Sequence, residues 1–204
     1  NMKIVEIEYT PNPNAVKFIL GESLTPLTVV AEFHSAEEAA NVPLARALFD
    51  IEHVITVFWT DRWLTVTQDG DMGWHELLRE IARPIREATV EDVSLGADWE
   101  AKMQEKLGDI DVTALGLDDE RIPLIQAILD DEVLPFLQGD GGGLEIKALV
   151  DNQLFIRYQG ACGTCPSSTM GTLMAIENLV QMEIDPEITV VPIDAQPGAA
   201  PGYF

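Results

Sequence analysis

The stretch that decides the fold runs from Gly139 to Ser168 and reads GDGGGLEIKALVDNQLFIRYQGACGTCPSS. Its segments Leu144–Val150 and Leu154–Tyr158 are rich in large apolar residues, as is typical of buried strands. Between them lies Asp151-Asn152, a pair that favours the tight turn of a hairpin. The glycines that precede the first segment indicate a tight turn into it. The stretch therefore predicts a glycine turn, a hairpin and then a loop.

Helical patterns lie on both sides of this hairpin. Asp118 or Asp119 is expected to cap a first helix, and Pro135 near its far end is expected to kink or terminate it. After the loop, Pro166 begins a second helix to about Met182, and a last strand follows at Ile188–Val191. The order α-β-β-α-β predicts a three-stranded sheet covered by two helices. The apolar positions are Ile122, Ile125, Leu129, Val133, Phe136 and Leu137 in the first helix, and Met170, Leu173, Met174 and Ile176 in the second.

The N-terminal half predicts a second small α+β unit. A helix-like run begins at Ser35 and reaches Phe49, with Ser35 and Glu38 in the spacing of a capping box. Another helix is expected from Gly73 to Ala88, where apolar residues recur at helical spacing. The expected strands are Ile4–Glu8, Val16–Leu20, Val54–Phe58 and Trp63–Thr67.

The two halves are joined by an acidic stretch with little apolar patterning. Residues 91–118 hold eight acidic and two basic side chains, so they are expected to form a linker with one short helix at Trp99–Leu107. The fold class is therefore α+β, with two small α+β domains. The expected division is a first domain at 1–90, the acidic linker at 91–118, a second domain at 119–194 and a flexible tail at 195–204.

The overall charge excludes several classes of partner. The 204 residues include 12 basic and 35 acidic ones, a net charge of −23. Such a surface opposes binding to nucleic acid and to anionic membranes. No apolar run reaches the roughly 18 residues of a membrane span. No signal or transit pattern begins the chain, so we expect a cytoplasmic protein, or a mitochondrial matrix protein if a presequence was removed.

The chain contains two cysteines, Cys162 and Cys165, three positions apart. This count excludes a secreted scaffold held by disulfides. Gly160 and Gly163 allow the backbone around them to turn tightly. With Pro166 in the first helical position, Cys165 is expected at or near the N-cap, where the helix dipole favours a thiolate. Redox, zinc and iron–sulfur sites all use a C-x-x-C pair, so the pair alone leaves these three open.

The surroundings of the pair carry no charge. From Tyr158 to Ile176 there are 19 consecutive residues without a charged side chain, in a chain that is 23% charged. Carboxylates near a thiolate would repel it, so their exclusion fits an anionic sulfur site. The alternative is that this loop and helix are simply buried against the sheet.

The number of ligands points to a second chain. Structural zinc sites and iron–sulfur clusters usually have four protein ligands, and this chain offers two thiolates. His34, His53 and His75 lie in the other half and are not spaced as ligands. A second copy of the same loop, related by a two-fold axis, would complete the set. A site shared in this way is expected to be exposed and easily opened. A thioredoxin-like role fits less well, because that motif normally follows a first strand.

Two groups of motifs make the sequence resemble a known family. The stretch Val133–Gln138 followed by Asp140-Gly141-Gly142 resembles the NifU C-terminal (Nfu) domain, as does Gly160-Ala161-Cys162-x-x-Cys165-Pro166-Ser167-Ser168-Thr169. The first half resembles the Nfu N-terminal domain. Its matching motifs are Thr10-Pro11-Asn12-Pro13-Asn14, Lys17-Phe18, Pro43-Leu44-Ala45, Leu48-Phe49, Val57-Phe58, Thr65-Val66-Thr67 and Trp74.

The resemblance implies an iron–sulfur cluster scaffold or carrier rather than an enzyme. In this family the C-x-x-C motifs of two subunits hold one 4Fe–4S cluster and pass it to apo-proteins. For this chain a 2Fe–2S cluster is the second expectation. Carried over, the cluster and metal ligands are Cys162 and Cys165. The implied partners are a second copy, apo client proteins and the upstream assembly machinery. The Asp140-Gly141-Gly142 turn is interpreted as structural, its glycines allowing close packing near the cluster loop. A thiol–disulfide oxidoreductase, a dimeric zinc protein and a pure interaction module that does not need the thiols remain the alternatives.

Overall fold

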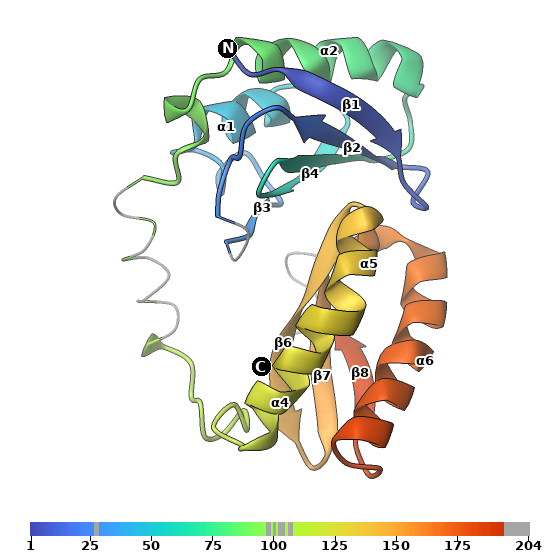
Figure 1. The fold of residues 1–204 in the computed structure, drawn as a ribbon. Helices are drawn as coiled ribbons and strands as arrows, with labels where there is room; N and C mark the ends of the chain where they lie inside the picture. Colours follow the sequence, from blue (N-terminus) through green and yellow to red (C-terminus); the bar gives the residue numbers. More distant parts are fainter. Residues whose placement is uncertain (27–28, 97–98, 100, 102–104, 106–107, 194–204) are drawn as a thin grey trace. The chain divides into compact units, whose positions relative to one another are not determined.

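The chain divides into two compact units, residues 1–99 and 100–204. They are seen in a computed structural model that describes all residues except 27–28, 97–98, 100, 102–104, 106–107 and 194–204, and residues 166–170 by their backbone (Figure 1). Each unit has its own sheet, helices and hydrophobic core, which confirms the α+β fold class. Among the described residues, no helix has the length and apolar character needed to cross a membrane.

The boundaries expected at residues 90, 118 and 194 stay predictions. The short helix expected at Trp99–Leu107 falls largely on residues outside the described part, as does the predicted tail at 195–204.

Unit 1 is a five-stranded antiparallel sheet in the order β1-β2-β5-β4-β3. All four predicted strands are present, and the short strand β3 was not predicted. Buried residues of α1 and α2 pack with strand residues in one core. The elements are β1 (Ile4–Tyr9), β2 (Ala15–Leu20), β3 (Ala31–Phe33), α1 (Pro43–Phe49), β4 (Val54–Thr60), β5 (Trp63–Gln68), α2 (Trp74–Glu87) and the 3₁₀ turn η1 (Glu91–Val93).

The helix expected from Ser35 to Phe49 is shorter than predicted. Residues 36–41 form turns, and α1 begins only at Pro43. The Glu38 N–H does donate to the Ser35 hydroxyl at 3.2 Å, as in a capping box. However, Pro43 has no N–H to continue a helix, and it holds Val42 in an extended conformation. The proline therefore separates the capped turns from the helix.

Unit 2 has the predicted order of elements and the predicted three-stranded sheet. In that sheet, β6 and β7 are antiparallel and β8 adds to β7 in parallel. Two helical segments, α4 to α5 and α6, lie along the sheet (Figure 1). The elements are α4 (Arg121–Ile128), the π-helical segment η2 (Leu129–Val133), α5 (Leu134–Gly139), β6 (Gly142–Val150), β7 (Gln153–Gly160), the 3₁₀ turn η3 (Ala161–Thr164), α6 (Pro166–Glu183) and β8 (Thr189–Ile193).

The β6–β7 hairpin has the two-residue turn that its sequence predicts. Asp151 and Asn152 both have positive φ, 51° and 58°, and Val150 pairs directly with Gln153. Two positive-φ residues give the turn a twist that matches the strands, and Asp and Asn tolerate this conformation. The hairpin therefore fixes the register that carries β7 to the cysteine loop.

Pro135 changes the first helix without ending it. The proline lacks an N–H for the carbonyl four residues earlier, and the turns before it widen into the π segment η2. The wider turn changes which residues face the core. Leu137 is buried, but Phe136, expected on the apolar face, is 74% exposed. Of the positions expected in the second helix, Ile176 is buried and Met174 is 67% exposed.

Candidate functional site

The cysteine loop connects the end of β7 to the start of α6. Gly160 ends the strand with φ 60° and ψ −139°, a conformation open to glycine. The turn η3 then carries Cys162, and Cys165 occupies the N-cap of α6, as predicted. Pro166 takes the first helical position, where its missing N–H costs nothing. The dipole of this 18-residue helix favours negative charge on the Cys165 sulfur.

The glycine-rich turn packs directly against this loop. The Ala161 N–H donates to the Gly141 carbonyl at 3.2 Å, and Gly142 pairs with Gly160. A side chain at Gly142 would overlap the Gln159 carbonyl and would place its Cβ 2.7 Å from the Cys162 sulfur. Only glycine leaves room at this position, which confirms that glycine in the turn allows close packing at the loop.

Both thiols are buried, so the expectation of an exposed site is wrong for this structure. Cys162 and Cys165 are each 1% exposed, and they are not joined in a disulfide. The Cys162 thiol donates to the Leu137 carbonyl at 3.9 Å and belongs to the core of unit 2. Burial of the loop was the alternative in the sequence, but its cause was not visible there, because α5 and the glycine turn close over Cys162 only in three dimensions. Of the loop residues, Thr164 is exposed.

A buried phenol lies in the same core as Cys162. Tyr158 on β7 is 4% exposed, and its hydroxyl has no hydrogen-bond partner among the described residues. Burial, together with the nearby Cys162 sulfur, raises the pKa of Tyr158 to about 12. The core around the Cys162 thiol is therefore of low polarity.

The three histidines lie in unit 1, apart from the cysteines in sequence. His34 pairs with Glu32 at 2.8 Å, and His75 is on α2. His53 lies beside Asp69 and Asp71, and the ligand atoms of these three residues lie within 4.8 Å of one another. Sequence spacing did not indicate this group, because the β4–β5 hairpin brings together residues 16 positions apart. The Nδ1 atom of His53 lies 2.9 Å from an Asp69 carboxylate oxygen, which is the distance of an ion pair.

We predict that this ion pair is visible in the titration of His53. Its hydrogen bond to Asp69 raises the pKa of His53, and the Asp71 N–H together with His53 lowers the pKa of Asp69. The pair should thus stabilise the fold fully between about pH 4 and about pH 6.5. The stabilisation should be lost as the pH rises through the raised pKa of folded His53. It should also be lost as the pH falls through the lowered pKa of folded Asp69. NMR titration of the ring should show the raised value, and D69N should lower it. An unchanged titration in D69N would contradict the assignment.

Family models match both units. The model described as "Scaffold protein Nfu/NifU N terminal" matches residues 5–92. The model described as "NifU-like domain" matches residues 125–191, which include both cysteines and the glycine turn. The two matches occur in the order that the motifs predict.

Known proteins match along most of the chain. The human "NFU1 iron-sulfur cluster scaffold homolog, mitochondrial" is 32% identical over 189 residues, covering 90% of this chain and 69% of that protein. The "NifU-like protein 4, mitochondrial" of Arabidopsis thaliana is 29% identical over 179 residues, with 86% and 61% coverage. The NMR structure of a NifU-like protein from Saccharomyces cerevisiae matches 43% of this chain and 76% of that one, at 25% identity and a TM-score of 0.36. The chain spans 60–64% of the length of its relatives from Drosophila species. The chain belongs to the Nfu/NifU scaffold protein family.

Proposed function

We propose that this protein is an iron–sulfur cluster carrier that receives a cluster at Cys162 and Cys165 and passes it to apo-proteins. The observation that carries the proposal is a pair of thiols on one turn, at a helix N-terminus, in a chain whose relatives are named iron–sulfur cluster scaffolds. Two thiolates are half of the usual four ligands of a cluster. The cargo is therefore a 4Fe–4S cluster, or a 2Fe–2S cluster, held between the C-x-x-C motifs of two subunits.

Loading requires the loop to open. Both sulfurs are buried in the single chain, and Cys162 is held under α5 by contact with the Leu137 carbonyl. Opening is a rotation about the loop that Gly160 and Gly163 make easy. The thiols lose their protons as iron binds, and the dipole of α6 stabilises the resulting charge at Cys165.

The cluster is released when the client's ligands replace those of the carrier. Client thiolates bind the irons one by one and displace the carrier cysteines, which take up protons and return to the core. No covalent bond of an organic substrate is made or broken, so the role is that of a carrier rather than an enzyme. The upstream assembly machinery supplies the cluster. The net charge of −23 opposes nucleic acid and anionic membranes as partners.

The names of the relatives support one of the two expected compartments. The human and Arabidopsis proteins are both named as mitochondrial. This favours the mitochondrial matrix, the alternative of the sequence analysis, over the expected cytoplasm.

Anaerobic reconstitution of the full chain with iron and sulfide tests the proposal. We expect about four irons and four sulfides per two chains, a cluster signature in visible and Mössbauer spectra, and a dimer on sizing. About two irons per dimer would identify the 2Fe–2S form. A colourless dimer that binds only zinc, or a monomer whose cysteines merely cycle between thiol and disulfide, would contradict the proposal. Transfer to an apo-protein that requires a cluster tests the last step.

A further inference from the structure

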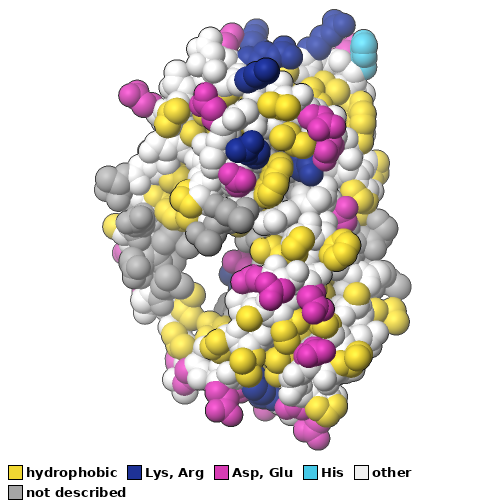
Figure 2. Space-filling view, viewed as in Figure 1, with side chains coloured by type: hydrophobic (Ala, Val, Ile, Leu, Met, Phe, Trp, Pro, Cys, Tyr) yellow, Lys and Arg dark blue, Asp and Glu magenta, His cyan; other side chains and the backbone are white. Residues whose placement is uncertain are grey.

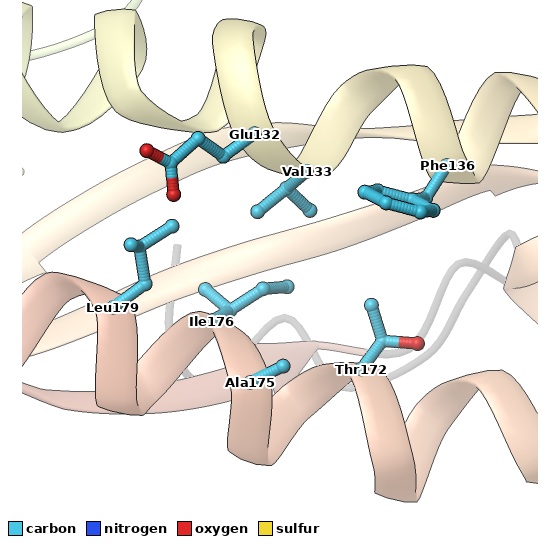
Figure 3. A pocket seen from close by; sticks show the side chains of 7 residues that line it. All are labelled: Glu132, Val133, Phe136, Thr172, Ala175, Ile176 and Leu179. Carbon is cyan, nitrogen blue, oxygen red and sulfur yellow. The ribbon is translucent and has the colours of Figure 1, made fainter.

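A groove runs between the two helical segments of unit 2. It has a volume of about 290 Å³, and η2 and α5 form one wall while α6 forms the other. Figure 3 shows Val133 opposite Ile176 and Phe136 opposite Thr172 across it. The Glu132 carboxylate lies near Leu179 at one end. Apolar side chains thus line most of a hollow on the surface of this unit.

One wall of the groove carries an aromatic side chain exposed to solvent. Phe136 is 74% exposed, because the wider turn of η2 directs it away from the core. An exposed aromatic ring beside an apolar hollow is typical of an interaction site, since aromatic anchors supply much of the energy of binding. The groove has the shape and chemistry to hold apolar side chains from another molecule.

An acidic segment adjoins the groove and is called the acidic rim below. It consists of the consecutive, exposed Asp130, Asp131 and Glu132 on η2, of which Glu132 lines the groove. Residues 119–204 contain three basic side chains, and all three are in ion pairs with carboxylates of the same unit: Arg121, Lys147 and Arg157. Figure 2 shows hydrophobic and acidic side chains next to each other over the helices of this unit.

We propose that this groove binds an amphipathic, positively charged helical segment of a partner protein. Apolar side chains of the segment would fill the groove against Phe136, and its Lys or Arg side chains would pair with the acidic rim.

A second copy of this chain is disfavoured as the occupant, because a two-fold contact would bring the two acidic rims together. The same elements also position the thiols, since Leu137, which contacts Cys162, follows Phe136, and Cys165 is the N-cap of α6. The partner's role as a cluster acceptor rests on the proposed function; the binding itself does not.

The test uses the full chain without cluster and two labelled synthetic peptides. One is an amphipathic helix with leucines on one face and lysines beside them, and the other has glutamates in place of the lysines. Fluorescence anisotropy should show binding of the basic peptide and at least about tenfold weaker binding of the acidic one. NMR shifts on titration should map to η2, α5 and α6. Equal binding of both peptides, or binding of neither, overturns the proposal.

Variants locate the site. Phe136→Ala should weaken binding of the basic peptide about tenfold, and D131N combined with E132Q should weaken it and reduce its dependence on salt. The matched control is Met182→Ala. Met182 lies on α6 and outside the groove, and its apolar side chain is 82% exposed. If Phe136→Ala binds as the original chain does, or instead abolishes self-association of the apo chain, the groove serves another purpose. Because the measurement needs no cluster, its failure is distinct from failure of cluster binding.

Discussion

Replacing Cys165 by alanine is expected to lower the iron and sulfide retained after reconstitution to less than about a tenth of the original amount. In the proposed carrier each chain supplies two of four ligands, so the change removes two ligands from every dimer. The cluster-bridged dimer should disappear with them, since the cluster is what holds the two loops together. Iron and sulfide analysis, visible spectra and sizing on the same sample measure all three quantities.

The fold should survive this change. Removing one small buried sulfur costs about 1–2 kcal/mol, and alanine fits the extended backbone of Cys165, with φ −94° and ψ 111°. Urea unfolding of the apo chain separates a lost ligand from a lost fold. The matched control is Met174→Leu, which removes an exposed thioether from the same helix and should keep a full cluster. A normal cluster in the Cys165→Ala chain would show that the ligand assignment is wrong.

Local signals in the sequence predicted the elements that carry the site. Asp151-Asn152 specified its turn because both residues tolerate positive φ, and Pro166 specified the start of α6 because it suits a first helical position. These rules act within a few residues, so no tertiary contact has to be known. They place Cys165 at the helix N-cap from the sequence alone.

The errors arose where one residue changes the course of the chain or where distant segments meet. Pro43 delayed the helix, so that the capping bond at Ser35 forms but no helix begins there. The π segment before Pro135 turned Phe136 to the solvent. The burial of Cys162 depends on Leu137, 25 residues earlier, and on a turn that no local pattern connects to it. Hydrophobic periodicity gives the apolar positions of a helix, but it does not give the shift that a π turn introduces.

Replacing Gly142 by alanine is expected to destabilise the apo chain by about 3 kcal/mol. The new methyl group would overlap the Gln159 carbonyl and press on the Cys162 sulfur and backbone nitrogen. Two of these atoms, the Gln159 carbonyl oxygen and the Cys162 nitrogen, belong to the backbone, and the β6–β7 pairing of Gly142 with Gly160 holds this part of the backbone in place. The strain must therefore separate the strands or displace the cysteine loop. Urea unfolding measures the first effect, and the cluster retained after reconstitution measures the second.

The matched control is Gly139→Ala, three residues earlier. A Cβ at Gly139, the last residue of α5, would meet no atom within 4 Å, so the change should leave stability within about 1 kcal/mol of the original. If Gly142→Ala were as stable as Gly139→Ala and bound the full cluster, the turn would not be packed against the loop in the working protein. A stable Gly142→Ala chain with little cluster would instead mean that the loop moves to relieve the strain. In that case the turn controls the position of Cys162 rather than the stability of the fold, which would make the buried thiol, and not the sheet, the feature that requires glycine here.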